Sequence, residues 1–223
     1  MSAPQSAERG EGSEEPVSVY QPALDRLRAR LADHSLDELV RRSGARRRED
    51  GRIGLRCVGR DYVIGYPDGI VLDADGAPAE ISLAIMLLLY LLESTGRELE
   101  DEWISFEQLP GGAGYMGSFR GRVIGPVVRA FGSNPEALVV AGEALDGERL
   151  ALGDAGVRLP ALPRVPIAYI LWAGDADFSP SASVVFDASV EGYLDAEAVT
   201  ALAEVATRRL VDPQFHSQRG VTG

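Results

Sequence analysis

The sequence predicts an α+β fold: a single domain in which a mainly antiparallel sheet packs against several helices, one of them apolar and buried. Short runs of alternating apolar and polar residues, separated by turns rich in glycine and proline, indicate hairpins. Other segments repeat apolar residues every three or four positions, which indicates helices. A chain of 223 residues that is 45% hydrophobic is long enough for one domain with its own core. We place that domain at residues 19–212, between a disordered N-terminal tail (1–18) and a loose C-terminal tail (213–223).

Composition excludes several classes of function. The net charge of −12 opposes binding to nucleic acid or to an anionic membrane. All 22 basic residues are arginine, so no lysine can form a Schiff base or bind phosphate in a P-loop. Cys57 is the only cysteine, which excludes a disulfide framework, a thiolate zinc site and an iron–sulfur cluster built by this chain alone. We expect a reduced, cytoplasmic setting, with neither a signal peptide nor a membrane anchor.

The chain becomes helical at Pro22, and leucines then recur at helical spacing. Ser35 followed by Glu38 predicts a capping box at the start of a second short helix. Five arginines follow within residues 41–48. Because the chain is acidic, we interpret them as a solvated segment that pairs with nearby carboxylates, rather than as a site for an anionic ligand.

A β-hairpin and a third short strand come next. Residues 52–58 and 61–66 predict two strands joined at Gly59-Arg60, and residues 70–72 predict the third. Residues 79–94 contain the longest apolar run, which falls short of the roughly 20 residues of a membrane span. We therefore expect a helix buried on nearly all sides at the centre of the core.

The middle of the chain predicts a brief extended segment at residues 103–106 and then two helices. Aromatic and apolar residues spaced by four predict a helix over 114–131, bent near Gly125-Pro126 where a backbone donor is missing. Asn134 is expected to cap the next helix, at 135–145.

Three further strands and a closing helix complete the predicted fold. The strands lie at residues 149–152, 157–159 and 166–172, and the last is so continuously apolar that both its faces should be covered. The final helix begins at Asp195.

Three carboxylates around the last strands form one candidate site: Asp175, Asp177 and Asp187. Together they could hold Mg²⁺ or Ca²⁺, or divide into a general acid and a general base. The alternative is that Asp175 tightens a turn while the other two accept hydrogen bonds from backbone amides. The sequence leaves both interpretations open.

Aromatic residues gather around the two loops rich in glycine, and an aromatic cleft beside loops is a common site for small flat ligands. The residues expected to line such a cleft are Trp103, Gly111, Gly112, Tyr115, Phe119, Trp172, Phe178, Ser181 and Ser183. The alternative is that they simply pack in the core.

Two segments carry a resemblance to a known family: WISFEQLPGG at 103–112 and ILWAGDADFSPSASVVFD at 170–187. They resemble the signatures of an uncharacterised family of prokaryotic proteins, described only as a domain of unknown function, and the likeness spans about residues 36–210. Some relatives look to be fused to a four-cysteine iron–sulfur domain of the kind found in corrinoid methyl-transfer proteins. That resemblance implies a role near one-carbon or tetrapyrrole cofactors. This chain lacks such a domain, and it lacks the histidine expected in many relatives near residues 88–91.

The expected function is therefore binding of a small aromatic or macrocyclic ligand of the corrinoid or tetrapyrrole kind, or of a partner protein that carries one. The ligand would lie in a cleft between the loop of residues 103–119 and the loop of residues 172–187. A divalent-metal hydrolase or transferase that uses the three aspartates is the first alternative, and a structural or interaction subunit is the second. No particular cofactor, catalytic residue or oligomeric state is predicted.

Overall fold

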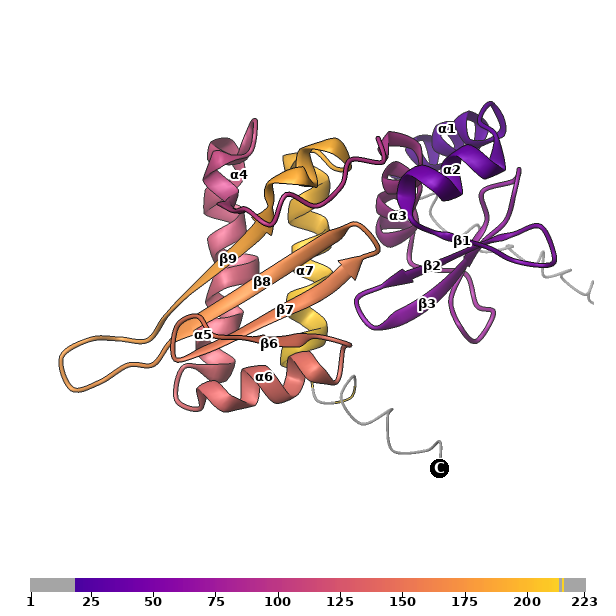
Figure 1. Ribbon diagram of the computed structural model, residues 1–223. Coiled ribbons are helices and arrows are strands. Elements are labelled where there is room, and N and C mark those ends of the chain that lie inside the picture. Colours follow the sequence, from indigo (N-terminus) through magenta and orange to yellow (C-terminus); the bar gives the residue numbers. More distant parts are fainter. Residues whose placement is uncertain (1–18, 213, 215–223) are drawn as a thin grey trace, which may run out of the picture.

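The computed structural model describes residues 19–212 and 214, and these residues form an α+β fold built on two antiparallel sheets (Figure 1). The first sheet has the strand order β1-β2-β3-β4, and the second has the order β5-β9-β8-β7-β6. Buried residues of both halves belong to one continuous apolar core. The predicted fold class is confirmed. Except for residue 214, the predicted tails lie outside the described residues.

The N-terminal half consists of the first sheet and the helices beside it. Its elements are α1 (Gln21–Ala32), α2 (Leu36–Ser43), β1 (Arg46–Arg47), β2 (Ile53–Cys57), β3 (Arg60–Ile64), β4 (Val71–Leu72) and α3 (Ile81–Glu93). Helix α3 matches the predicted core helix, and most of its side chains are buried. Tyr90 of α3 donates a hydrogen bond to the carbonyl of Ser43 (2.5 Å), which attaches α3 to the end of α2.

The turn of the first hairpin lies one residue earlier than predicted, at Val58-Gly59. Both residues have positive φ, 43° and 73°, as a two-residue turn that matches strand twist requires. A β-branched residue rarely adopts this conformation. Val58 is held in it because its side chain is fully buried and its N–H donates to the carbonyl of Ala161 (2.9 Å). This bond connects the first sheet to β7.

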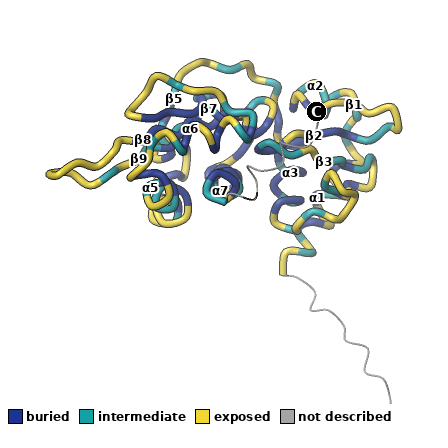
Figure 2. Tube along the Cα trace, turned by 90° about the horizontal axis from the view of Figure 1, so that it is seen from below, coloured by how far each residue is buried: buried dark blue, intermediate teal, exposed yellow. Residues whose placement is uncertain are grey.

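The C-terminal half contains the second sheet and the remaining helices. Its elements are β5 (Trp103–Ser105), η1 (Phe106–Gln108), α4 (Gly112–Phe119), η2 (Arg120–Ile124), α5 (Gly125–Phe131), α6 (Pro135–Glu143), β6 (Glu148–Leu150), β7 (Ala155–Leu162), β8 (Val165–Trp172), β9 (Ser181–Asp187), η3 (Ala188–Gly192) and α7 (Ala196–Val211). Helices α5 and α7 lie along the same face of this sheet (Figures 1 and 2). All of β8 except Trp172 is buried, as its apolar sequence predicts.

Near Pro126, where a bend is predicted, the structure shows a change of helix type. Between α4 and α5 the chain forms a π-helix, η2, which ends immediately before Gly125-Pro126. Proline has no N–H to donate, so the turn that precedes it widens.

Two predicted helix caps are wrong. Ser35 occupies the cap position of α2, but its side chain makes no capping hydrogen bond. Asn134 makes none either, because its backbone (φ −146°, ψ 78°) departs from the usual cap conformation. A capping box forms instead at Ser105 and Gln108, at the start of η1.

Helix α7 joins the two halves through a buried arginine. Arg209 donates hydrogen bonds to the carbonyls of Cys57 (2.5 Å) and Val58 (2.8 Å) and to the hydroxyl of Tyr62 (2.6 Å). Its guanidinium also lies 5.9 Å from the centre of the Tyr62 ring. Burial raises the pKa of the Tyr62 hydroxyl, although the neighbouring Arg209 opposes the change. Within the described part of the chain, no helix is long and apolar enough to cross a membrane.

Candidate functional site

The two tryptophans expected to enclose a ligand lie at opposite ends of one strand. Trp103 pairs with Asp187 at the last residue of β9, whereas Trp172 pairs with Ser181 at the first. Six residues of extended strand separate these positions, which corresponds to roughly 20 Å. The predicted cleft between them is therefore not formed.

The other aromatic residues of the expected set are also dispersed. Phe119 is fully buried and stacks on Phe106 with ring centres 4.1 Å apart, so it belongs to the core. Tyr115 is exposed on α4, where its hydroxyl lies 3.4 Å from a carboxylate oxygen of Glu197. The residues of the second loop, Trp172, Phe178, Ser181 and Ser183, lie on the β8–β9 hairpin.

The three aspartates do not form one ligand set, because β9 separates Asp175 and Asp177 from Asp187. Oδ1 of Asp175 accepts hydrogen bonds from the N–H groups of Asp177 and Phe178, both 2.8 Å long, and these bonds lower the pKa of Asp175. Asp187 lies at the far end of β9. Among the described residues, no group of three or more histidine, cysteine, aspartate or glutamate side chains is arranged to hold a metal ion.

Asp187 instead organises the chain where the two halves meet. Its buried carboxylate accepts hydrogen bonds from the N–H groups of Glu100 (3.0 Å), Asp101 (2.9 Å) and Ser189 (3.0 Å). Burial raises the pKa of this carboxyl, but the hydrogen bonds outweigh it, so the pKa lies below its ordinary value. The ionised group thereby fixes the connection between the halves against the start of η3.

Replacing Asp187 by asparagine is expected to lower the free energy of unfolding at pH 7 by about 2 kcal/mol, since an amide cannot accept all three bonds. Because the pKa of Asp187 is lowered in the folded state, the ionised carboxylate adds its full share to the free energy of unfolding at pH values above the ordinary aspartate pKa, which is about 4. This share is lost as the pH falls below that value. The difference between wild type and variant should therefore shrink between pH 5 and pH 3 in urea unfolding. Asp177→Asn is the control, and an equal loss in both variants would contradict the role of Asp187.

The first signature segment forms a tight turn whose two glycines are required by geometry. Gly111 has φ +81°, which side chains other than glycine's rarely allow. At Gly112, an added Cβ would lie 2.0 Å from the carbonyl oxygen of Phe106. This turn of residues 109–112, the LPGG turn, directs Leu109 and Pro110 toward the start of α7.

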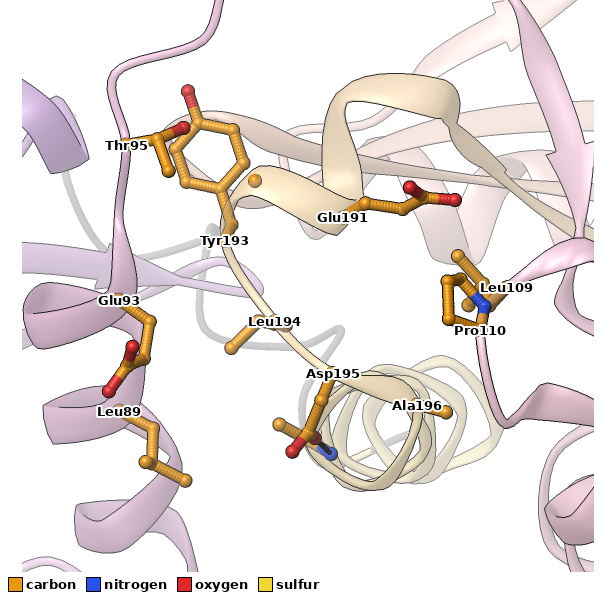
Figure 3. A pocket seen from close by; sticks show the side chains of 12 residues that line it. Leu89, Glu93, Thr95, Leu109, Pro110, Glu191, Tyr193, Leu194, Asp195 and Ala196 are labelled. Atoms are coloured by element: carbon orange, nitrogen blue, oxygen red, sulfur yellow. Dashed lines mark hydrogen bonds between the residues drawn. The ribbon is translucent and has the colours of Figure 1, made fainter.

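A pocket of about 510 Å³ opens where the LPGG turn, α3 and the start of α7 meet, and we call it the junction pocket (Figure 3). Figure 3 shows Leu89 and Glu93 on α3 facing Leu109 and Pro110 across it. The residues that line it are Leu89, Glu93, Thr95, Leu109, Pro110, Glu191, Gly192, Tyr193, Leu194, Asp195, Ala196 and Ala198. Both halves of the protein thus contribute to one pocket.

Close backbone packing joins the two halves at one end of the junction pocket. The N–H of Thr95 donates to the carbonyl of Gly192 (3.0 Å), and a Cβ at Gly192 would lie 2.7 Å from Oγ1 of Thr95. Next to it, the hydroxyl of Tyr193 donates to the carbonyl of Arg97, and its ring centre lies 5.9 Å from that of Tyr90. Both tyrosine rings are buried, so this wall is fixed.

The charged groups that line the junction pocket are all acidic. Glu93 is paired with Arg30 of α1 (2.7 Å), and Asp195 caps α7 by accepting a hydrogen bond from the N–H of Ala198 (2.9 Å). Glu191 is exposed on the rim. The lining residues include no arginine, histidine or cysteine. The pocket therefore combines apolar walls with a negative rim.

Comparison with known proteins assigns most of the chain to a family. A family model described as "Domain of unknown function (DUF3786)" matches residues 35–209. The chain belongs to the DUF3786 family. The match covers most of both halves, so the family domain includes the LPGG turn, α3 and the pocket they line. No curated protein and no solved structure matches the chain.

Sequence reasoning identified one wall of the junction pocket and missed the others. The LPGG turn was singled out by its glycines, but Glu93 and Glu191 were not considered as site residues. Asp195 was predicted only as a helix start. Nothing in the local sequence pattern indicates that these acids share a pocket, because Glu93 lies about a hundred residues before Glu191 and Asp195.

Proposed function

We propose that this DUF3786 domain binds a small molecule that combines an apolar, aromatic body with a positively charged group, and that the site is the junction pocket. The observation that carries this proposal is the combination of apolar walls with a rim of carboxylates. The proposed site is therefore the junction pocket and not the expected cleft between Trp103 and Trp172. Of the two signature segments, only the first contributes residues to this pocket.

The size of the junction pocket supports a compact organic ligand. Small-molecule sites in proteins have volumes of roughly 300–1,000 Å³ and are lined mainly by apolar side chains, with a few polar groups that orient the ligand. The junction pocket, at about 510 Å³, has this composition, with leucine, proline and alanine side chains on its walls. Burial of apolar ligand surface against these walls would supply most of the binding energy.

Charge narrows the class of ligand. Three carboxylates line the pocket and no lining residue is basic. Because Glu93 is paired with Arg30 of α1, Glu191 and Asp195 supply most of the negative charge. A ligand with an amine gains attraction there, whereas a macrocycle that carries carboxylates, such as haem, is repelled. Cationic aromatic compounds therefore fit better than acidic tetrapyrroles.

Binding is better supported than catalysis. The hydroxyl of Tyr193 is engaged with the carbonyl of Arg97, and the carboxylate of Asp195 caps α7. The lining residues include neither histidine nor cysteine, so a nucleophile activated by a histidine is not assembled there. Binding of a small molecule accounts for the pocket without requiring any catalytic side chain.

The test is a comparison of charge-matched compounds by thermal shift and isothermal titration. Tryptamine and phenethylamine should raise the melting temperature, whereas indole-3-acetate and phenylacetate, of the same shape but opposite charge, should not. Glu191→Gln should weaken amine binding about tenfold, because a charge-assisted contact of about 1.4 kcal/mol is lost. Haem and cobalamin should be titrated in parallel as macrocyclic ligands.

Two further variants make the test specific to the junction pocket. Glu148→Gln removes an exposed carboxylate on β6, away from the pocket, and should leave amine affinity unchanged. Leu89→Trp places a larger side chain in the pocket and should reduce binding while the protein remains folded by circular dichroism. Equal shifts by amines and acids, or equal effects of Glu148→Gln and Glu191→Gln, would refute the proposal.

A further inference from the structure

The connection between β8 and β9 projects from the second sheet as an arm. Figure 1 shows the chain extending well beyond the ends of both strands, and Figure 2 shows it exposed along most of its length. We define the hairpin arm as residues 172–181, which include most of the second signature segment's acidic and aromatic residues. The arm joins the first residue of β9, whereas η3, which borders the junction pocket, follows the last residue of β9. The arm is therefore distinct from the junction pocket.

Two aromatic side chains are exposed on the hairpin arm. Phe178 is 74% exposed and Trp172 is 41% exposed. Large aromatic side chains are costly to expose to water, and they are enriched among the residues that dominate protein–protein binding energy. Their presence on a projecting loop therefore indicates a contact surface rather than a packing element.

Hydrogen bonds hold the loop that presents Phe178 in one shape. The N–H of Asp175 donates to the carbonyl of Phe178 (2.8 Å), while the carboxylate of Asp175 accepts from the N–H of Phe178 (2.8 Å). At the base of the arm, the N–H of Ala173 donates to the carboxylate of Asp154 (2.7 Å). Pro180 packs against the turn after α5, since a Cβ at Gly132 would lie 2.8 Å from it. A preorganised loop loses little conformational entropy when it binds.

The charge of the hairpin arm defines the partner's chemistry. Residues 172–181 contain two carboxylates, Asp175 and Asp177, and no basic residue. Asp175 and Asp177 are exposed beside Phe178, and Asp177 contributes only its backbone N–H to the hydrogen bonds that shape the loop. An anionic membrane or a nucleic acid would be repelled by this surface, whereas a basic protein surface would be attracted.

We propose that the hairpin arm docks on another protein, inserting Phe178 and Trp172 into an apolar pocket that is rimmed by arginine or lysine. The aromatic side chains anchor the complex by burial. Asp175 and Asp177 orient the approach through complementary charge, so association is faster at low ionic strength.

The test uses a random-peptide display library selected against the 223-residue protein. Enriched peptides should combine aromatic or aliphatic residues with flanking arginine or lysine. Synthetic copies, measured by fluorescence anisotropy, should bind Phe178→Ser at least about tenfold more weakly than wild type. Asp177→Asn should weaken binding and reduce its dependence on salt.

Matched controls separate the hairpin arm from the rest of the surface. Val140→Ser changes another apolar side chain, 59% exposed on α6, and should leave peptide binding unchanged. Glu191→Gln in the junction pocket should also have no effect, so failure of the proposed function and failure of this proposal are distinguishable. Because Phe178 is exposed, the melting temperature of Phe178→Ser should match that of wild type.

Four results would overturn the proposal. The first is failure to enrich any peptide, or enrichment without basic residues. The second is equal binding by wild type and Phe178→Ser. The third is binding of wild type, but not of Phe178→Ser, to neutral phosphatidylcholine vesicles, which would make the arm a membrane contact. The fourth is self-association of wild type in sedimentation that Phe178→Ser abolishes, which would make a second copy of the chain the occupant.

Discussion

Replacing Arg209 by methionine is expected to lower the free energy of unfolding by about 4 kcal/mol, because three buried acceptors lose their donor at once. The carbonyls of Cys57 and Val58 and the hydroxyl of Tyr62 all accept from the Arg209 guanidinium, at 2.5–2.8 Å. Methionine keeps the aliphatic part of the side chain but ends two atoms short of the guanidinium nitrogens, so the loss combines the three polar contacts with the space left by the guanidinium. Urea unfolding followed by tryptophan fluorescence measures it.

Arg208 provides a matched control one residue earlier on α7. Its side chain is exposed and lies 4.0 Å from the carboxylate of Glu80, a distance at which surface ion pairs contribute little. Arg208→Met should therefore change the free energy of unfolding by less than about 0.5 kcal/mol. Arg209→Lys should fall between the two methionine variants, since an ammonium group cannot reproduce the planar set of donors. Equal losses in Arg208→Met and Arg209→Met would show that Arg209 does not join the two halves.

Replacing Gly112 by alanine is expected to destabilise the protein by about 3 kcal/mol. The added Cβ would lie 2.0 Å from the carbonyl oxygen of Phe106 and 3.4 Å from Cβ of Leu109. Because the first neighbour is backbone, no side-chain rotation relieves the clash, and the LPGG turn must shift. Leu109 lines the junction pocket, so amine binding should weaken as well.

At Gly114, two residues further along α4, the same substitution is expected to have the opposite effect on stability. Nothing lies within 4 Å of a Cβ built there, and alanine is the better helix former by roughly 0.5–1 kcal/mol. Gly114→Ala should therefore stabilise the protein slightly while Gly112→Ala destabilises it. The measurement is the melting temperature of each variant in thermal unfolding, compared with that of wild type. Similar melting temperatures would mean that the turn adapts and that its glycines are not required.

The sequence by itself determined the local elements and the fold class. Apolar spacing predicted α3 as a buried helix and β8 as a strand covered on both faces, and burial confirms both. The start of α7 at Asp195 is confirmed by its capping hydrogen bond to Ala198. These features follow from the chain's own periodicity and backbone chemistry, so neighbouring residues suffice to predict them.

Only the tertiary structure decided which of these elements form a site. The pairing of β9 with both β5 and β8 placed Trp103 and Trp172 at opposite ends of one strand, so neither the expected cleft nor the three-aspartate ligand set is formed. The same packing brought Glu93 of α3 to one pocket with Glu191 and Asp195. The physical reason is that strand register and helix packing are set by contacts between residues far apart in the chain, to which local spacing is insensitive. Residues that share a signature segment, such as Trp172 and Asp187, were therefore separated, and residues with no common pattern were brought together.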